Sequence, residues 1–156
     1  VEYHVWARER ALAAVAALSP EQFLRGLGNS FGSVRDTVAH LYGADEVWLE
    51  CWTGGSPTGL PPAERFPDLA ALRAAWAKLD PRLRAFVAGL DAAALARSLT
   101  YQAFNGQRAT VPYWQMLQHV INHGSYHRGQ VTTLLPKLGA AAPKSMDLIA
   151  FYRERA

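Results

Sequence analysis

The chain has 156 residues, of which half are apolar and 19% are charged, and its formal net charge is +3. This length is ordinary for one domain and is long enough to bury roughly two-thirds of the unfolded surface. The balanced composition excludes disordered and fibrous classes of protein. We therefore expect one globular domain over residues 1–156.

The charge and cysteine content limit the partners that the protein can have. Basic residues are scattered singly among acidic ones, whereas nucleic-acid binding needs a clustered basic face, so a nucleic-acid partner is not expected. No apolar run approaches the roughly 18 residues of a membrane-spanning helix, which predicts no membrane partner. The single cysteine, Cys51, allows no internal disulfide, and we expect a cytoplasmic protein.

Helix signals dominate the first third of the chain. Residues 3–18 contain no Gly or Pro and are rich in Ala, Leu and Arg, which predicts a long helix. The segment Ser19-Pro20-Glu21-Gln22 combines an N-cap, a first-turn proline and a capping-box glutamine, so a short helix should follow. Ser33, with Asp36 three residues later, marks the start of a second long helix that runs to about Thr53.

The rest of the chain predicts two further long helices and a hairpin. Residues 68–89 have a helical pattern, in which Pro81 predicts a kink or a break. Asn105-Gly106 between β-prone runs is a strong hairpin signal. A fourth long helix should occupy residues 112–136 and a short one residues 146–155. Together these elements predict an all-α fold, a four-helix bundle with a long crossover connection that carries a small β-hairpin.

Three of the five histidines lie at four-residue steps on the predicted fourth helix, namely His119, His123 and His127. Two imidazoles one helical turn apart can bind one ion with bonds of about 2.0–2.1 Å, but residues eight apart lie about 12 Å apart along the axis. With about 100° per residue, His127 lies within the apolar arc, His123 at its edge, and His119 toward the polar face. We therefore expect His123 and His127 to form a chelate, with His119 at its rim or in contact with a ligand.

A third metal ligand must come from another helix. His40 lies on the flank of the apolar arc of its helix, beside Val47 and Cys51, and could face a neighbouring helix. Three neutral nitrogen donors would leave coordination positions for water or substrate, as in reactive rather than purely structural sites. The alternative is that these histidines are ordinary core or rim residues, since imidazoles have many other uses. Cys51 can likewise be read as a core thiol.

Two charged residues, Asp45 and Arg128, lie within the predicted apolar arcs of their helices. Buried charges are costly unless they are paired, so we expect these two to meet inside the bundle. The pair could fix the histidine-bearing helices relative to each other or could be purely structural. His4 is expected to be an ordinary polar residue of the first helix. Four tryptophans are expected in the core: Trp6, Trp48, Trp52 and Trp114.

Motifs along nearly the whole chain resemble the DinB family, which contains DNA-damage-inducible proteins and YfiT-like metalloenzymes. The resemblance begins with Tyr3 and Trp6. Its longer segments are Ser33-Val-Arg-Asp-Thr-Val-Ala-His40-Leu-Tyr-Gly-Ala-Asp45-Glu-Val-Trp48-Leu, His119-Val-Ile-Asn-His123-Gly-Ser-Tyr-His127-Arg-Gly-Gln and Met146-Asp-Leu-Ile-Ala-Phe.

The resemblance implies a four-helix bundle that holds a divalent ion, often zinc or nickel, by three histidines. On this chain these are His40, His123 and His127. The resemblance also implies a homodimer. It further implies a reaction like that of its metal-dependent relatives, which are transferases that use thiols such as bacillithiol or mycothiol and a thiol-dependent maleylpyruvate isomerase.

The chemistry of such a centre leaves three functions open. A bound divalent cation lowers the pKa of its ligand, which suits transfer of a low-molecular-weight thiol to a small-molecule electrophile or hydrolysis of a small substrate. The resemblance favours thiol transfer. Hydrolysis needs a general base, and Gly124 stands where the protease motif His-Glu-x-x-His has glutamate. The third alternative is a non-catalytic bundle, stabilised by its metal, that serves in a stress response.

Overall fold

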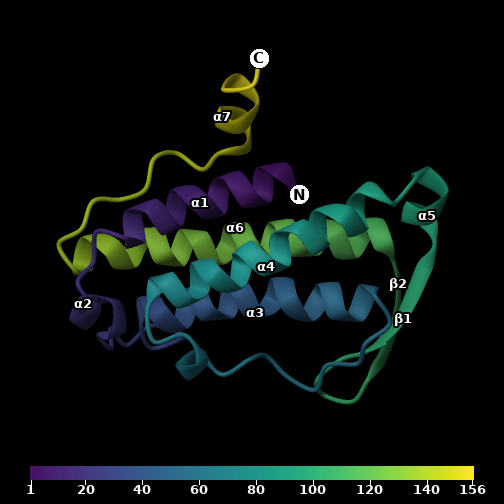
Figure 1. The fold of residues 1–156 in the computed structure, drawn as a ribbon, viewed down its shortest axis with the longest axis horizontal. Helices are drawn as coiled ribbons and strands as arrows, with labels where there is room; N and C mark the ends of the chain where they lie inside the picture. The colour runs from purple at the N-terminus through teal and green to yellow at the C-terminus, as the bar shows by residue number, and fades with distance from the viewer.

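The computed structural model describes residues 1–156, and four long helices form its body (Figure 1). They are α1 (Glu2–Val15), α3 (Val34–Trp52), α4 (Leu69–Ala88) and α6 (Tyr113–Lys137). Helix α3 packs against α6 and α4, and α6 also packs against α1. The predicted four-helix bundle is confirmed.

Short elements connect and extend the bundle. The helices among them are α2 (Pro20–Leu24), a 3-10 turn (Ala63–Arg65), α5 (Ala92–Ala96) and α7 (Leu148–Arg153). Strands β1 (Ser98–Gln102) and β2 (Arg108–Pro112) form the predicted antiparallel hairpin. Gly106 has a φ of 82° in the hairpin turn, a conformation that glycine adopts without steric cost.

The path of the chain explains where the hairpin lies. Helices α3 and α4 run in the same direction, so residues 53–68 return the chain along the bundle between them (Figure 1). The hairpin belongs to the next connection, from α4 to α6, and lies near the end of α3 (Figure 1). The connection that returns along the bundle is therefore not the one that carries the hairpin, and the hairpin lies close to α3.

Local sequence signals set most helix ends. The Ser19 side chain and Gln22 form a complete capping box, and the Ser33 hydroxyl accepts a hydrogen bond from the backbone N–H of Asp36. The break considered at Pro81 does not occur, because α4 is continuous through it. Pro81 is exposed, so its ring faces solvent rather than the core. Because proline has no N–H, the carbonyl of Ala77, one turn earlier, loses its helical partner, but Ala77 is exposed too.

Apolar side chains from all four long helices fill the interior. Fully buried members include Leu12, Leu49, Leu72, Trp76, Met116 and Leu135. Of the tryptophans predicted in the core, Trp52 is buried, whereas the prediction for Trp114 is wrong because 49% of its surface is exposed. None of the helices combines the length and apolar character needed to cross a membrane.

Candidate metal centre

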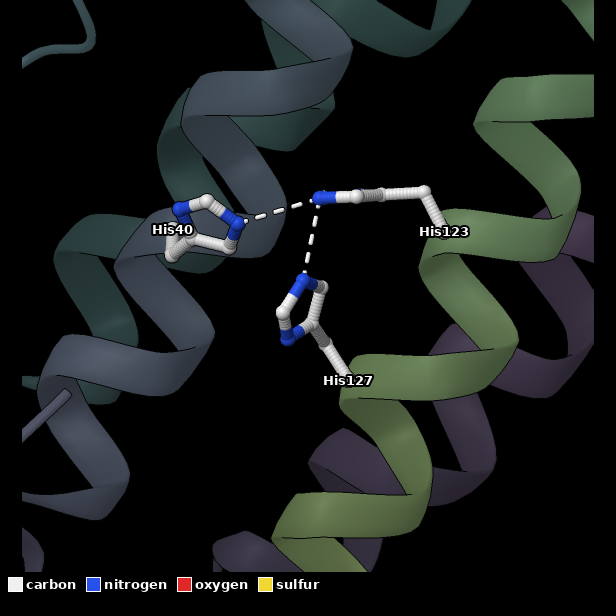
Figure 2. Close-up of side chains that lie close together, drawn as sticks. All are labelled: His40, His123 and His127. Atoms are coloured by element: carbon white, nitrogen blue, oxygen red, sulfur yellow. Dashed lines mark hydrogen bonds between the residues drawn. The ribbon is translucent and has the colours of Figure 1, made fainter. Parts of the chain in front are cut away.

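The structure brings together the three histidines that the sequence singled out. His40 extends from α3 toward His123 and His127, which extend from successive turns of α6 (Figure 2). The Nε2 atom of His123 lies 3.1 Å from Nε2 of His40 and 3.0 Å from Nε2 of His127. One nitrogen from each ring lies within 4.8 Å of the others.

This donor set fits a divalent ion. Two nitrogens bound at 2.0–2.1 Å with a tetrahedral angle between them are about 3.3 Å apart, close to both observed separations. Three imidazole nitrogens also leave at least one position for another ligand. The spacing and the donor chemistry are therefore compatible with a metal site whose remaining face is open.

A hydrogen bond fixes the orientation of His127. Its Nδ1 lies 2.8 Å from Oε1 of Gln130, an oxygen that can only accept, so Nδ1 carries the proton and donates. The lone pair of His127 is therefore on Nε2, the nitrogen that faces the other two rings. Such a partner on the far nitrogen is a regular feature of metal-binding histidines. The i, i+3 spacing of His127 and Gln130 on one helix was a signal in the sequence that we did not use.

Burial keeps His40 and His123 neutral. The ring of Phe31, from the loop before α3, stacks on His40 with centroids 4.3 Å apart. Burial, and then the neighbouring charge of His127, lowers the pKa of His40 to about 4. Burial and the neighbouring histidines lower the pKa of His123 to about 4 as well. At neutral pH both rings thus offer lone pairs without first losing a proton.

The low pKa values predict an acid-sensitive stability for the metal-free protein. Because His40 and His123 have pKa values of about 4 when folded and about 6.5 when unfolded, only the unfolded state gains protons between these limits. Their stabilising contribution is present above pH 6.5 and is lost as the pH falls toward 4. Urea unfolding in the presence of a chelator should therefore give a lower free energy of unfolding at pH 5 than at pH 7. Replacing both histidines by alanine should flatten this slope, and an unchanged slope would contradict the assignment.

His40 and His123 also line a cavity of about 260 Å³. It lies between α3, the 53–68 connection and the hairpin, and its other walls include Trp48, Cys51, Leu60, Tyr101, Ala103 and Phe104. No Asp, Glu, Lys or Arg side chain lines it. The candidate centre therefore borders an apolar chamber that a small molecule could occupy.

Two other predicted residues have distinct positions near the site. His119 is exposed and packs its ring against Trp48 and His123, so it lies at the rim and outside the cluster of three nitrogens. Cys51 is buried in the cavity wall, and burial raises the pKa of its thiol. The Cys51 thiol is therefore protonated at neutral pH and is a weak nucleophile.

The predicted Asp45–Arg128 pair does not form. Both side chains are buried, but the imidazole of His4 lies between them. Nε2 of His4 donates to Oδ1 of Asp45 at 3.0 Å, and Nδ1 of His4 accepts from Nη1 of Arg128 at 3.5 Å. A neutral imidazole can donate at one nitrogen and accept at the other, so it bridges a carboxylate and a guanidinium. His4, which we expected to be an ordinary polar residue, is 3% exposed and links α1 to α3 and α6.

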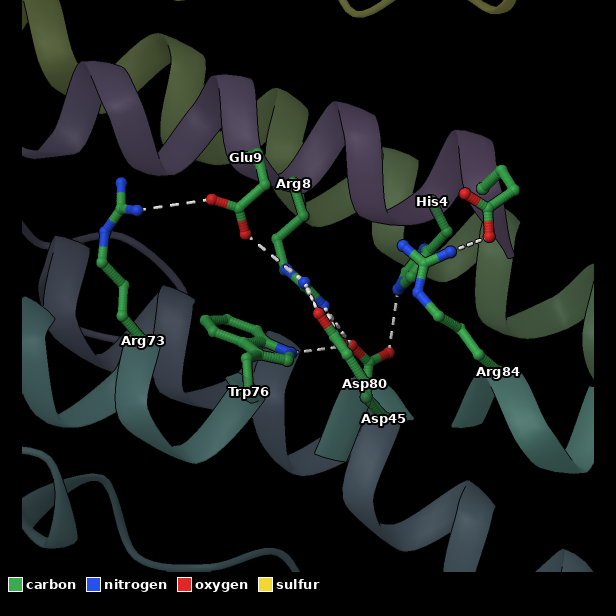
Figure 3. A network of polar contacts seen from close by, with 9 residues as sticks. His4, Arg8, Glu9, Asp45, Arg73, Trp76, Asp80 and Arg84 are labelled. Atoms are coloured by element: carbon green, nitrogen blue, oxygen red, sulfur yellow. Dashed lines mark hydrogen bonds and ion pairs between the residues drawn. The ribbon is translucent and has the colours of Figure 1, made fainter. Parts of the chain in front are cut away.

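Asp45 has further partners inside the bundle. The indole Nε1 of Trp76 donates to Oδ2 of Asp45 at 3.0 Å, and Nη1 of Arg8 lies 3.8 Å from the same oxygen (Figure 3). Arg8 also forms a two-fold contact with Asp80 on α4. Although burial opposes it, the His4 and Trp76 contacts keep the pKa of Asp45 below its ordinary value. The network thus joins all four long helices through one buried carboxylate.

Gly124, between the two histidines of α6, makes room for this network. A Cβ at Gly124 would lie 2.6 Å from Cε1 of His4 and 2.8 Å from Nη1 of Arg128. We expect Gly124→Ala to lower the free energy of unfolding by about 1–2 kcal/mol, because overpacking outweighs the better helix propensity of alanine. Gly129→Ala on the same helix is the matched control, since nothing lies within 4 Å of the added atom. It should stabilise the protein by about 0.5–1 kcal/mol in urea unfolding, and equal effects of both changes would contradict the steric argument.

Comparison with known proteins agrees with this architecture. The model of the DinB family matches residues 1–154. The chain belongs to the DinB family. It is 26% identical to Protein DinB of Bacillus subtilis (strain 168) over 158 aligned residues, which cover 96% of this chain and 91% of that protein. The crystal structure of a DinB-like protein from Bacillus cereus ATCC 10987 has the same fold, with a TM-score of 0.69 at 18% identity over 90% of this chain and 91% of that one.

Membership of the DinB family gives the three histidines a context. The family is metal-associated, and in this DinB-family chain the three residues lie close enough to hold one ion. Sequence reasoning missed Phe31, Gln130 and the hairpin wall of the cavity. For Phe31 and the hairpin no local signal existed, because their contacts with the site depend on how separate segments pack.

Proposed function

We propose that His40, His123 and His127 bind a divalent ion, zinc or nickel, and that the protein is a thiol-dependent transferase acting on a small electrophile. The observation that carries this proposal is the convergence of three imidazole nitrogens at the edge of an apolar cavity without an acidic side chain. A bound divalent ion would lower the pKa of a coordinated thiol and so supply a thiolate.

The residues of the chain have separate tasks in this proposal. The three histidines hold the ion with neutral donors, and Gln130 keeps His127 in the required tautomer. The apolar walls exclude water from the reacting atoms, which strengthens electrostatic interactions there. In the reaction the thiol sulfur forms a bond to an electrophilic carbon, and the bond from that carbon to its leaving group breaks. The leaving group keeps the electron pair of the broken bond, and the thiol proton passes to solvent. In an epoxide the leaving oxygen stays attached to the product and takes up a proton.

The cavity favours thiol transfer over hydrolysis. Activation of water for attack usually relies on a general base within hydrogen-bond reach, most often a histidine or a carboxylate. No carboxylate lines this cavity, Gly124 leaves no acidic group between His123 and His127, and the two lining histidines, His40 and His123, are assigned to the metal. A thiol has an ordinary pKa of about 8.5, much nearer to neutrality than that of water, so a bound ion would convert it to a thiolate without such a base.

Turnover assays with defined metal content test the proposal. Protein depleted of metal and reloaded with Zn²⁺ or Ni²⁺ should consume bacillithiol, mycothiol or glutathione in the presence of styrene oxide. Depleted protein and His123→Ala should not. If metal removal lowers the melting temperature greatly while no thiol and electrophile pair is turned over, the non-catalytic alternative is favoured instead.

We further propose that the protein forms a homodimer through α7, which packs on α1, and the outer face of α6, since Trp114 of α6 and Leu148 of α7 line the same surface hollow. Large apolar side chains are exposed there, including Trp114, Leu148, Ile149 and Tyr152. Burial of such a patch in a second copy would remove apolar surface from water. Light scattering should give twice the chain mass for the wild type and one chain mass for Trp114→Glu, and a monomeric wild type would refute the proposal. The cytoplasmic location stays a prediction.

A further inference from the structure

The cavity beside His40 and His123 has walls that restrict what it can bind. Its lining residues with polar atoms, apart from His40 and His123, are Cys51, Tyr101 and Gln102, and none of them carries a formal charge. A carboxylate, phosphate or ammonium group placed against these walls would lose hydration without gaining a counterion from the chain. The cavity therefore discriminates against charged substituents.

The size of the cavity restricts the ligand further. Cavities for drug-sized ligands usually measure about 300–1,000 Å³, and this one, at about 260 Å³, lies below that range. It suits a molecule the size of one substituted aromatic ring. A long or branched ligand would have to extend past the hairpin into solvent.

Three aromatic residues surround the space. Trp48 and Tyr101 pack edge to face with centroids 5.1 Å apart, which fixes both rings in the wall. Phe104, in the loop of the hairpin, is 54% exposed, joins no aromatic pair and does not pack against the core. Its ring lines the cavity without an aromatic partner. A planar apolar ligand would supply that partner.

We propose that the electrophile bound in this cavity is an uncharged, planar apolar molecule of about one-ring size, and that Phe104 and Gln102 set this preference. The inference rests on the proposed function only in that it takes the ligand to be an electrophile. The binding preference itself can be measured without turnover. The ligand contacts Phe104 with its apolar face, and its end away from the histidines lies near Gln102. The uncharged Gln102 is the reason that a substituent at that end must be neutral.

Binding of unreactive probes to the metal-depleted protein tests the inference, because a bound ion would itself attract a carboxylate. The probes are 4-(hydroxymethyl)benzamide, 4-(hydroxymethyl)benzoate and 4-(aminomethyl)benzyl alcohol, which share a hydroxymethyl-substituted ring and carry a neutral, an anionic and a cationic group at the other end. By calorimetry or NMR titration the neutral probe should bind at least about tenfold more tightly than either charged one, because only it keeps its far end free of the cost of desolvating a charge. Equal or tighter binding of a charged probe would overturn the inference.

Variants of exposed wall residues make the test specific. Phe104→Ala should weaken binding of the neutral probe about fivefold, as expected for one lost aromatic contact, without changing metal content. Leu24→Ala, at an exposed apolar residue of α2 outside the cavity, is the matched control and should have no effect. Gln102→Arg should shift the preference toward the benzoate, because it places a counterion in the wall. If Phe104→Ala binds like the wild type, the cavity is not the ligand site.

The outcomes separate this inference from the proposed function. Probe binding in the expected order without any thiol consumption would leave the cavity assignment in place and refute thiol transfer. Thiol consumption that is as fast with charged as with neutral electrophiles would support thiol transfer and refute the cavity assignment.

Discussion

Replacing His123 with alanine is expected to remove stoichiometric divalent metal from the protein. His123 is the central member of the cluster, since its Nε2 lies within about 3 Å of both other Nε2 atoms. Loss of a residue that only hydrogen-bonds to a metal ligand usually weakens metal affinity by about 10–100-fold. Loss of a ligand itself, one of three protein donors here, should therefore weaken the affinity by more than about 100-fold. Elemental analysis of protein purified without a histidine tag, together with a competition titration against a chelator, measures both quantities.

Matched variants show whether the effect is specific. His40→Ala and His127→Ala should lose the metal in the same way. His119→Ala should keep it, because His119 lies on the same face of α6 but outside the cluster. Gln130→Ala should weaken affinity by about 10–100-fold through loss of the hydrogen bond to His127. Full occupancy in His40→Ala or His123→Ala would refute the three-histidine site.

Helical periodicity was sufficient to place the two α6 members of the cluster, His123 and His127. The angular positions of His119, His123 and His127 depend only on their spacing along one helix, and this spacing placed the first at the rim and the other two inward. His40 could be placed on the flank of its own helix, but only the packing of α3 against α6 shows that this flank faces His123. The resemblance to the DinB family, rather than the helical pattern alone, indicated that His40 and His123 bind the same ion.

The partners of buried charges were beyond the reach of the sequence. Periodicity correctly placed Asp45 and Arg128 in the interior, where both are buried. It could not show that α1 inserts His4 between them, because the rotation of α1 about its axis depends on tertiary packing. The sequence pattern of α1 is weakly amphipathic, with buried His4 and Arg8 among its inward residues, so its inner face was hard to recognise.

The hairpin shows the same limit. Asn105-Gly106 predicted its turn from local backbone preference, and the strands lie where expected. Nothing in the local sequence predicted that residues 101–104 would form a wall of the cavity beside His40. That contact follows from the parallel arrangement of α3 and α4, which depends on the long connection between them.

Replacing Asp45 with alanine is expected to destabilise the protein by about 3–5 kcal/mol, the range for breaking a buried ion pair by removing one partner. The Asp45 carboxylate accepts hydrogen bonds from His4 and Trp76 and lies 3.8 Å from Arg8. Without it, Arg8 keeps only its contacts with acids at the edge of the bundle, and two buried donors lose their acceptor. Urea unfolding at pH 7 measures the loss, in metal-free and metal-loaded protein.

Two comparisons show whether charge or shape dominates the network. Asp45→Asn keeps the shape and one acceptor oxygen, so it should cost less than Asp45→Ala but clearly more than zero, since the counter-charge for Arg8 and Arg128 is lost. Glu64→Ala removes a carboxylate that is 77% exposed and should change stability by less than about 0.5 kcal/mol. Arg128→Met should be far milder than Arg128→Ala, because the methionine side chain fills most of the buried volume without leaving a charge. If Asp45→Ala lowers the free energy of unfolding by no more than Glu64→Ala, the buried carboxylate does not hold the four helices together. Apolar packing alone must then fix the position of His4 against Gly124.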